Sequence, residues 1–206
     1  APLVHSPTFG FALWGGFERR APMFGMAQAA LFARNAGGAI DSIGSLYDGA
    51  SLTGYPERVF FDDWPRDAAA QAAARFLLFG AIYVNSSWSR CELRMSSDGL
   101  AISGAAAPGF GDKAAAVRRL VQSFGREAGA PLVSFQEGGR GVDVHYGDGV
   151  PESLRSPQTA SRGALSGLPQ VTIVGGACFQ ALPPHYPTLT FMAQALSVGR
   201  AFSADV

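Results

Sequence analysis

The sequence has little charge and no excess of either sign. Only 16% of its 206 residues are charged, against about 25% in a typical soluble domain, and its 16 basic residues balance its 16 acidic ones. Proteins that bind nucleic acid by neutralising phosphates are normally basic, so this balance argues against a nucleic-acid partner. A disordered chain would be more charged and less apolar than one with 48% hydrophobic residues.

Cysteine, histidine and long apolar runs are also scarce. The two cysteines, Cys91 and Cys178, are too few for a disulfide framework, although a single bridge between them stays open. The three histidines are scattered without the spacing of a metal site, and no cofactor motif is present, so we expect neither metal nor cofactor. The longest apolar run, at 76–84, has nine residues, about half of what a membrane span needs. We therefore expect no transmembrane segment.

The first residues do not resemble a signal peptide, yet the chain starts with Ala1 rather than Met. Export to the periplasm or the medium and residence in the cytoplasm both stay open.

What is present indicates one α+β domain over residues 1–206. The length fits a single domain. Asp98-Gly99 lies between two alternating segments and predicts a hairpin near 91–103. The glycine-rich stretch at 138–141 predicts a second hairpin near 131–146. Hairpins favour a mainly antiparallel sheet, and we expect three to four helices packed on it.

The individual elements follow from hydrophobic periodicity and from residues that begin or end helices. Strands are predicted at 7–13, 58–61, 81–84, 91–95, 100–102, 131–135, 142–146 and 170–174. Helices are predicted at 23–34, 65–79, 113–127 and 188–198, although the start of the last one also fits a strand. Loops are expected at 41–56 and 147–168. In the helix at 113–127, the predicted buried stripe is Val117, Leu120, Val121 and Phe124.

Two places carry residue types suited to nucleophilic or acid–base chemistry. Cys178 follows an apolar segment that ends in Gly-Gly, where a nucleophile and free backbone N–H groups can meet, and His185 is a candidate base. Asp143 and His145 lie two residues apart on a predicted strand and share a face, so the carboxylate can orient the imidazole. A Cys91–His145 pair also stays open, because catalytic partners need not be neighbours in sequence. The simpler interpretations are a buried, inert cysteine and a solvent-facing strand.

Aromatic residues make up 11% of the chain, including three Trp and 15 Phe. Core packing explains most of them, and the remainder suggests a contact surface. The candidate contact residues are Trp14, Phe17, Tyr55, Phe60, Trp64 and Tyr186.

The sequence therefore favours a non-catalytic binding or assembly domain. Its partner would be another protein or a second copy, met through an aromatic and apolar surface, and near-zero net charge favours association. One alternative is a small hydrolase or transferase that uses Cys178 or the Asp143/His145 pair. The other is a sensor of a small apolar ligand, with a cavity between sheet and helices.

Overall fold

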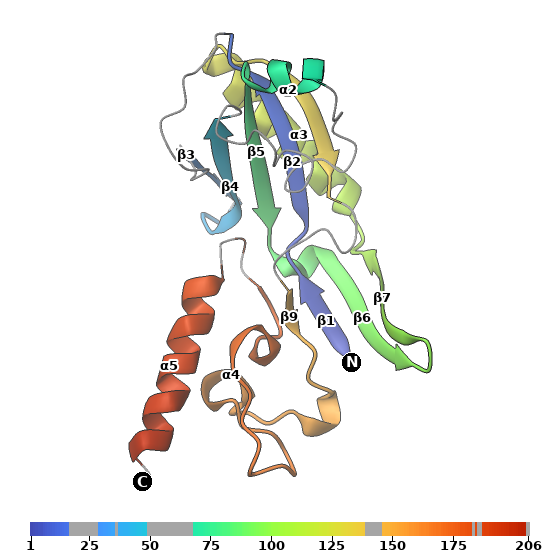
Figure 1. The fold of residues 1–206 in the computed structure, drawn as a ribbon, viewed down its shortest axis with the longest axis vertical. Coiled ribbons are helices and arrows are strands. Elements are labelled where there is room, and N and C mark those ends of the chain that lie inside the picture. Colours follow the sequence, from blue (N-terminus) through green and yellow to red (C-terminus); the bar gives the residue numbers. More distant parts are fainter. Residues whose placement is uncertain are drawn as a thin grey trace. The chain divides into compact units, whose positions relative to one another are not determined.

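The computed structural model of the chain describes residues 1–16, 29–35, 37–48, 68–138, 146–182, 184 and 187–204. The predicted α+β class is confirmed, because these residues form two antiparallel sheets, of four and five strands, together with four α-helices (Figure 1). The chain divides into two compact units. Unit 1 comprises Ala1–Ser6, Asn85–Ala107 and Asp143–Val206, and unit 2 comprises Pro7–Val84 and Pro108–Val142. The single domain predicted from the sequence stays a prediction.

Unit 2 is built on the five-stranded sheet, in the order β3-β4-β5-β2-β8. Its strands are β2 (Thr8–Trp14), β3 (Ala29–Arg34), β4 (Ile40–Asp48), β5 (Leu77–Val84) and β8 (Leu132–Glu137). Fully buried Phe9 stacks on Phe110 and Phe135, with ring centroids 5.7 and 5.4 Å apart. Phe11 lies directly across from Gly80, whose missing side chain leaves room for the ring. These phenylalanine side chains therefore form part of the hydrophobic core of unit 2.

The helices of unit 2 are α2 (Ala68–Ala74) and α3 (Phe110–Glu127). The predicted helix at 113–127 is confirmed. Val117 and Val121 are buried as expected, whereas Leu120 is exposed and Phe124 is half-buried. Lys113, the single lysine of the chain, forms an ion pair with Asp41 and so connects α3 to β4.

Unit 1 contains the four-stranded sheet, in the order β7-β6-β1-β9. Its strands are β1 (Pro2–His5), β6 (Ser89–Ser96), β7 (Gly99–Ala106) and β9 (Tyr146–Asp148). Its α-helices are α4 (Thr159–Arg162) and α5 (Thr188–Ala204), and its 3-10 helices are η2 (Ser86–Trp88), η3 (Glu152–Leu154) and η4 (Gly175–Cys178).

The hairpin predicted near 91–103 is confirmed. β6 and β7 pair along their whole length around the Asp98-Gly99 turn, where Gly99 has a φ of 121° that favours glycine. Of the hairpin predicted near 131–146, the first strand is present as β8, which pairs with β2. Most of its predicted partner strand, at 142–145, lies outside the described residues, so the pairing of the two stays a prediction.

Several element predictions need correction. Residues 29–34, predicted as the end of a helix, form strand β3, because they pair in register with β4. Residues 41–48, predicted as loop, form most of β4, whose Gly44 allows close approach to β5. The helix at 65–79 is described as α2 only over 68–74, and β5 already begins at Leu77. The strand at 170–174 is replaced by a single bridge between Thr172 and Ala164. The strand predicted at 58–61 lies outside the described residues.

Candidate functional site

Helix α5 presents an inner and an outer face, and its inner face is anchored within unit 1. The inner residues are spaced along one side of the helix and are buried or half-buried: Pro187 just before its first turn, then Phe191, Gln194 and Val198. The Oε1 of Gln194 accepts a hydrogen bond from the backbone N–H of Gly175 at 3.1 Å. The ring of Phe191 lies 5.4 Å from that of Phe179. These contacts fix the rotation of α5 about its own axis.

The outer face of α5 is apolar and exposed. Leu189, Met192 and Leu196 recur at intervals of three and four residues, and 77%, 62% and 56% of their surfaces are exposed. Arg200 is the one charged residue in the sequence of this helix. A helix that is apolar all round is normally buried, whereas a free surface helix carries charged residues on its outer side. We call the surface formed by Leu189, Met192 and Leu196 the outer α5 face.

Unit 1 as a whole buries few apolar side chains. Prolines aside, five hydrophobic side chains are buried among its described residues, against sixteen in unit 2. Of the fifteen large apolar side chains that the described residues expose, ten belong to unit 1. The outer α5 face is therefore part of a unit whose large apolar side chains are mostly on its surface.

Cys178 lies beneath α5 and is buried, with 1% of its surface exposed. Its thiol donates a hydrogen bond to the carbonyl of Ile173 at 3.3 Å and accepts one from Nε2 of Gln194 at 3.4 Å. Burial raises the pKa of the Cys178 thiol, because a low-dielectric surrounding disfavours the thiolate, and the Gln194 hydrogen bond opposes this. The surroundings favour a structural role, since the thiolate is the nucleophilic form. His185, its predicted base, lies outside the described residues.

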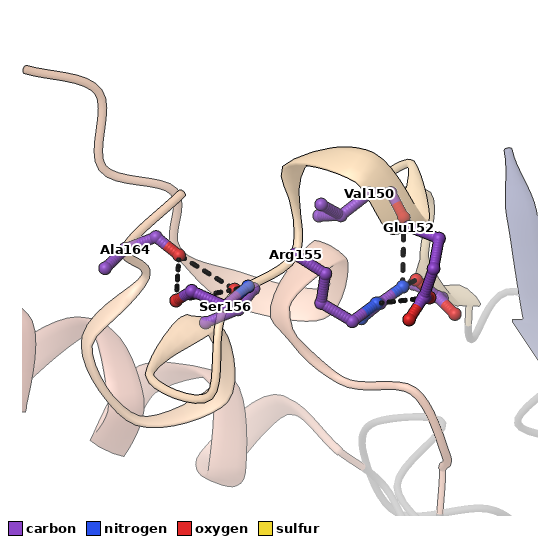
Figure 2. A network of polar contacts seen from close by, with 7 residues as sticks. Val150, Glu152, Arg155, Ser156 and Ala164 are labelled. Atoms are coloured by element: carbon purple, nitrogen blue, oxygen red, sulfur yellow. Dashed lines mark hydrogen bonds and ion pairs between the residues drawn. The ribbon is translucent and has the colours of Figure 1, made fainter. Parts of the chain in front are cut away.

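Cys178 also lines a cavity of about 550 Å³ in unit 1, beside a network of polar contacts. Arg155 lies at the centre of this polar network and forms ion pairs with Asp148 and, at 3.2 Å, with Glu152 (Figure 2). It also donates a hydrogen bond to the carbonyl of Val150 at 2.9 Å. These groups bond one another and so hold the segment after β9 in place. The ligand-sensor hypothesis stays a prediction.

A second polar network folds the chain just beyond Arg155. The hydroxyls of Ser156 and Thr159 donate hydrogen bonds to the carbonyl of Ala164 at 3.0 and 2.8 Å (Figure 2). The polar side chains on this wall of the cavity therefore have partners within the protein.

The structure brings together a cysteine and a histidine that the sequence analysis did not pair. Nδ1 of His5 lies 3.3 Å from Sγ of Cys91, because β1 and β6 are neighbours in the sheet. The backbone N–H of His5 donates to Ser89, and its ring lies 5.9 Å from that of Tyr146. A thiol within hydrogen-bond reach of an imidazole is the arrangement of an activated nucleophile and its base. Both cysteines are free thiols, so the bridge to Cys178 is not formed.

The remaining candidates are placed as follows. Trp14 lies at the end of β2 in unit 2, is 44% exposed and stacks on Phe76, with centroids 5.9 Å apart. The other predicted site residues lie outside the described part of the chain: Asp143, His145, Phe17, Tyr55, Phe60, Trp64 and Tyr186. Within that described part, no three His, Cys, Asp or Glu side chains converge as metal ligands. None of the helices described is both long and apolar enough to span a membrane.

The fold and the site thus define an α+β protein with two antiparallel sheets and an exposed apolar helix face. The sequence matches no protein-family model and no curated protein. Its function is therefore inferred from its own residues.

Proposed function

We propose that the protein is a non-catalytic association domain that binds a protein partner through the outer α5 face. The observation that supports this proposal is that α5 is apolar on both sides, with Phe191 and Val198 packed inward and Met192 and Leu196 directed outward. Water contact with such a face is unfavourable, and docking against an apolar surface removes it.

The size of the effect indicates how large the contact must be. Full burial of three side chains of this kind contributes at most about 5–9 kcal/mol, at about 1.5–3 kcal/mol each. Association itself costs about 4–15 kcal/mol in lost freedom of motion. The outer α5 face is therefore the centre of a contact rather than the whole of it, and stable interfaces bury about 800 Å² on each partner.

The residues around the face define the partner chemistry. Arg200 follows Leu196 by four residues and so lies at the edge of the same side of the helix. A matching partner has an apolar patch with an acidic residue at its rim. Such a rim charge contributes to the rate and register of docking more than to its affinity.

Two matched variants test the proposal. Leu196→Glu places a charge in the outer α5 face, and Leu120→Glu places one at an exposed position of α3. Tagged versions are expressed in the cell of origin, and the size of the native species is measured by size-exclusion chromatography with light scattering. We expect Leu196→Glu to reduce the mass of that species by the mass of the partner, with an unchanged melting temperature, and Leu120→Glu to preserve it. A free chain in the wild type, or a species that Leu196→Glu leaves intact, contradicts the proposal.

A second candidate is a thiol-dependent hydrolase or transferase. The observation that favours it is the 3.3 Å contact between Nδ1 of His5 and Sγ of Cys91. In this case Cys91, rather than Cys178, is the candidate nucleophile, and His5 its base. Alkylation of the native protein with iodoacetamide tests it: rapid labelling of Cys91 supports this candidate, and labelling no faster than that of a free cysteine peptide removes its support.

A further inference from the structure

We infer that β7 is the pairing edge of a symmetric dimer, in which β7 of a second copy of this chain extends the four-stranded sheet of unit 1. The inference goes beyond the proposed function, because it concerns another surface and another occupant than the outer α5 face.

Among the described residues, the two sheets have four edge strands, which differ in how well they are protected. Edge strands of natural proteins are usually short or carry charged residues, which prevent pairing with another chain. Among the described strands, β3 ends in Arg34, β8 ends in Glu137, and β9 has three residues including Asp148. β7 has eight residues and no charged residue, and it is exposed along nearly its whole length. It is the edge best suited to accept a further strand.

The β6–β7 hairpin has one apolar face. Leu93 lies directly across from Ile102, and Met95 across from Leu100, so all four side chains share that face. Met95, Leu100 and Ile102 are 84%, 62% and 48% exposed. This apolar ribbon is in contact with water over most of its surface.

The opposite face of the hairpin is polar and small. Arg94 lies across from Ala101, and Glu92 lies across from Ser103. Arg94 and Glu92 form an exposed ion pair at 2.8 Å. Every charge on the hairpin strands is thus on β6, one strand in from the edge.

Beyond Leu93 the hairpin has little support. β1 pairs with β6 at Cys91 and Glu92. Beyond this pairing, the N–H of Leu93 donates a hydrogen bond to the carbonyl of Ala1 at 2.8 Å, and the N-terminal ammonium of Ala1 donates one to the carbonyl of Leu93 at 2.7 Å. From there to the turn, the two strands are paired only with each other among the described strands. A two-stranded hairpin is marginally stable in water, and additional strands stabilise it.

A second copy of β7 fits this edge better than a charged strand would. In an antiparallel pair related by a two-fold axis through Ala101, Leu100 of each copy lies opposite Ile102 of the other. The two apolar ribbons then form one continuous face. Ala101 meets Ala101 of the second copy without steric conflict. The two Arg94 side chains are three strand spacings apart, roughly 14 Å, which exceeds the Debye length of about 8–10 Å.

Two variants and the wild type test the inference by analytical ultracentrifugation over a concentration series. Ala101→Lys brings two lysines together at the two-fold axis, whereas Val133→Lys places a lysine at an exposed position of edge strand β8. We expect the wild type and Val133→Lys to be dimeric and Ala101→Lys to be monomeric. A monomeric wild type at every concentration, or a dimer that Ala101→Lys leaves intact, overturns the inference.

If Ala101→Lys fails to fold, a cysteine variant at the same position tests the pairing of the two β7 strands by disulfide formation. In a Cys91→Ser background, Ala101→Cys places two thiols directly opposite each other, at a Cβ separation suited to a disulfide. We expect a disulfide-linked dimer under mild oxidation from Ala101→Cys and none from Ser103→Cys, which is displaced from the axis. Equal linkage of both overturns the inferred pairing. A dimer that Leu196→Glu abolishes and Ala101→Lys preserves overturns β7 pairing while supporting the α5 contact.

Discussion

The side-chain amide of Gln194 donates a hydrogen bond to the buried sulfur of Cys178, with 3.4 Å between Nε2 and Sγ. Its Oε1 accepts from the N–H of Gly175, so one side chain of α5 connects to both ends of η4. A polar side chain buried among apolar ones must meet its partners, and it therefore sets the rotation of the helix. With Gln194 turned inward, Leu196 on the opposite side faces outward.

Replacing Gln194 tests whether it anchors the helix. Gln194→Leu has a similar size but cannot accept a hydrogen bond, which leaves the N–H of Gly175 without this partner. We expect a loss of about 1–3 kcal/mol in the free energy of unfolding, measured by urea denaturation. Ser197→Ala, at an exposed position of the same helix, should change it by less than about 0.5 kcal/mol. Equal stability of the two variants contradicts the anchoring role.

The raised pKa of Cys178 predicts a loss of stability at alkaline pH. In the unfolded chain the thiol ionises near its ordinary pKa of about 8.5, whereas burial keeps it protonated in the folded protein to higher pH. The folded state therefore binds more protons above about pH 8.5. The contribution of Cys178 to the free energy of unfolding is fully present below that pH, and it is lost as the pH rises through the pKa of the thiol in the folded protein. Cys178→Ser should flatten the slope of unfolding free energy against pH, and Cys91→Ser should retain it. A slope that Cys178→Ser leaves unchanged contradicts the assignment.

Gly80 tests how tightly the sheet of unit 2 is packed. A methyl group at this position meets the ring of Phe11 on the neighbouring strand, and that ring is fully buried. We expect Gly80→Ala to destabilise the protein by about 1–3 kcal/mol, as overpacking of a core does. Gly111→Ala is the matched control, since nothing lies within 4 Å of the added carbon and alanine favours a helix. A neutral Gly80→Ala would show that the ring moves aside.

The His5–Cys91 contact predicts which thiol reacts first. Cys178 is buried beneath α5, while Cys91 is partly exposed and lies beside an imidazole. We expect iodoacetamide to label Cys91 before Cys178 in the native protein, as followed by mass spectrometry of tryptic peptides. His5→Gln should slow labelling of Cys91 because it removes the base. If His5→Gln leaves the rate of Cys91 labelling unchanged, His5 does not act as a base for this thiol and only packs beside it.

The parts of the fold that follow from local chemistry were predictable from the sequence. The Asp98-Gly99 turn and its flanking alternation specify the β6–β7 hairpin. The apolar periodicity of residues 113–127 indicates α3, which begins slightly earlier, at Phe110. The helix predicted at 188–198 is present and continues to Ala204.

Elements that depend on distant partners were not predictable in this way. Ala29–Arg34 has the small and apolar residues of a helix, and it becomes a strand because β4 pairs with it. Gly44 and Ser45 suggest a loop, yet small side chains are what a central strand between close neighbours requires. The His5–Cys91 contact joins residues from two strands far apart in sequence, and no spacing in the sequence indicates it. The outer α5 face had one sequence signal, which is a helix containing a single charge.

Site-specific photo-crosslinking from α5 tests the central claim most directly. A benzophenone amino acid replaces Met192 in the outer α5 face, and Leu120 on α3 in a control protein, and both are irradiated in the cell of origin. Crosslinking at Met192 should give one discrete adduct larger than the free chain, and Leu120 should give none. The adduct should disappear when Leu196→Glu is added. No adduct at Met192, or the same adducts from both positions, would contradict a protein contact at the outer α5 face.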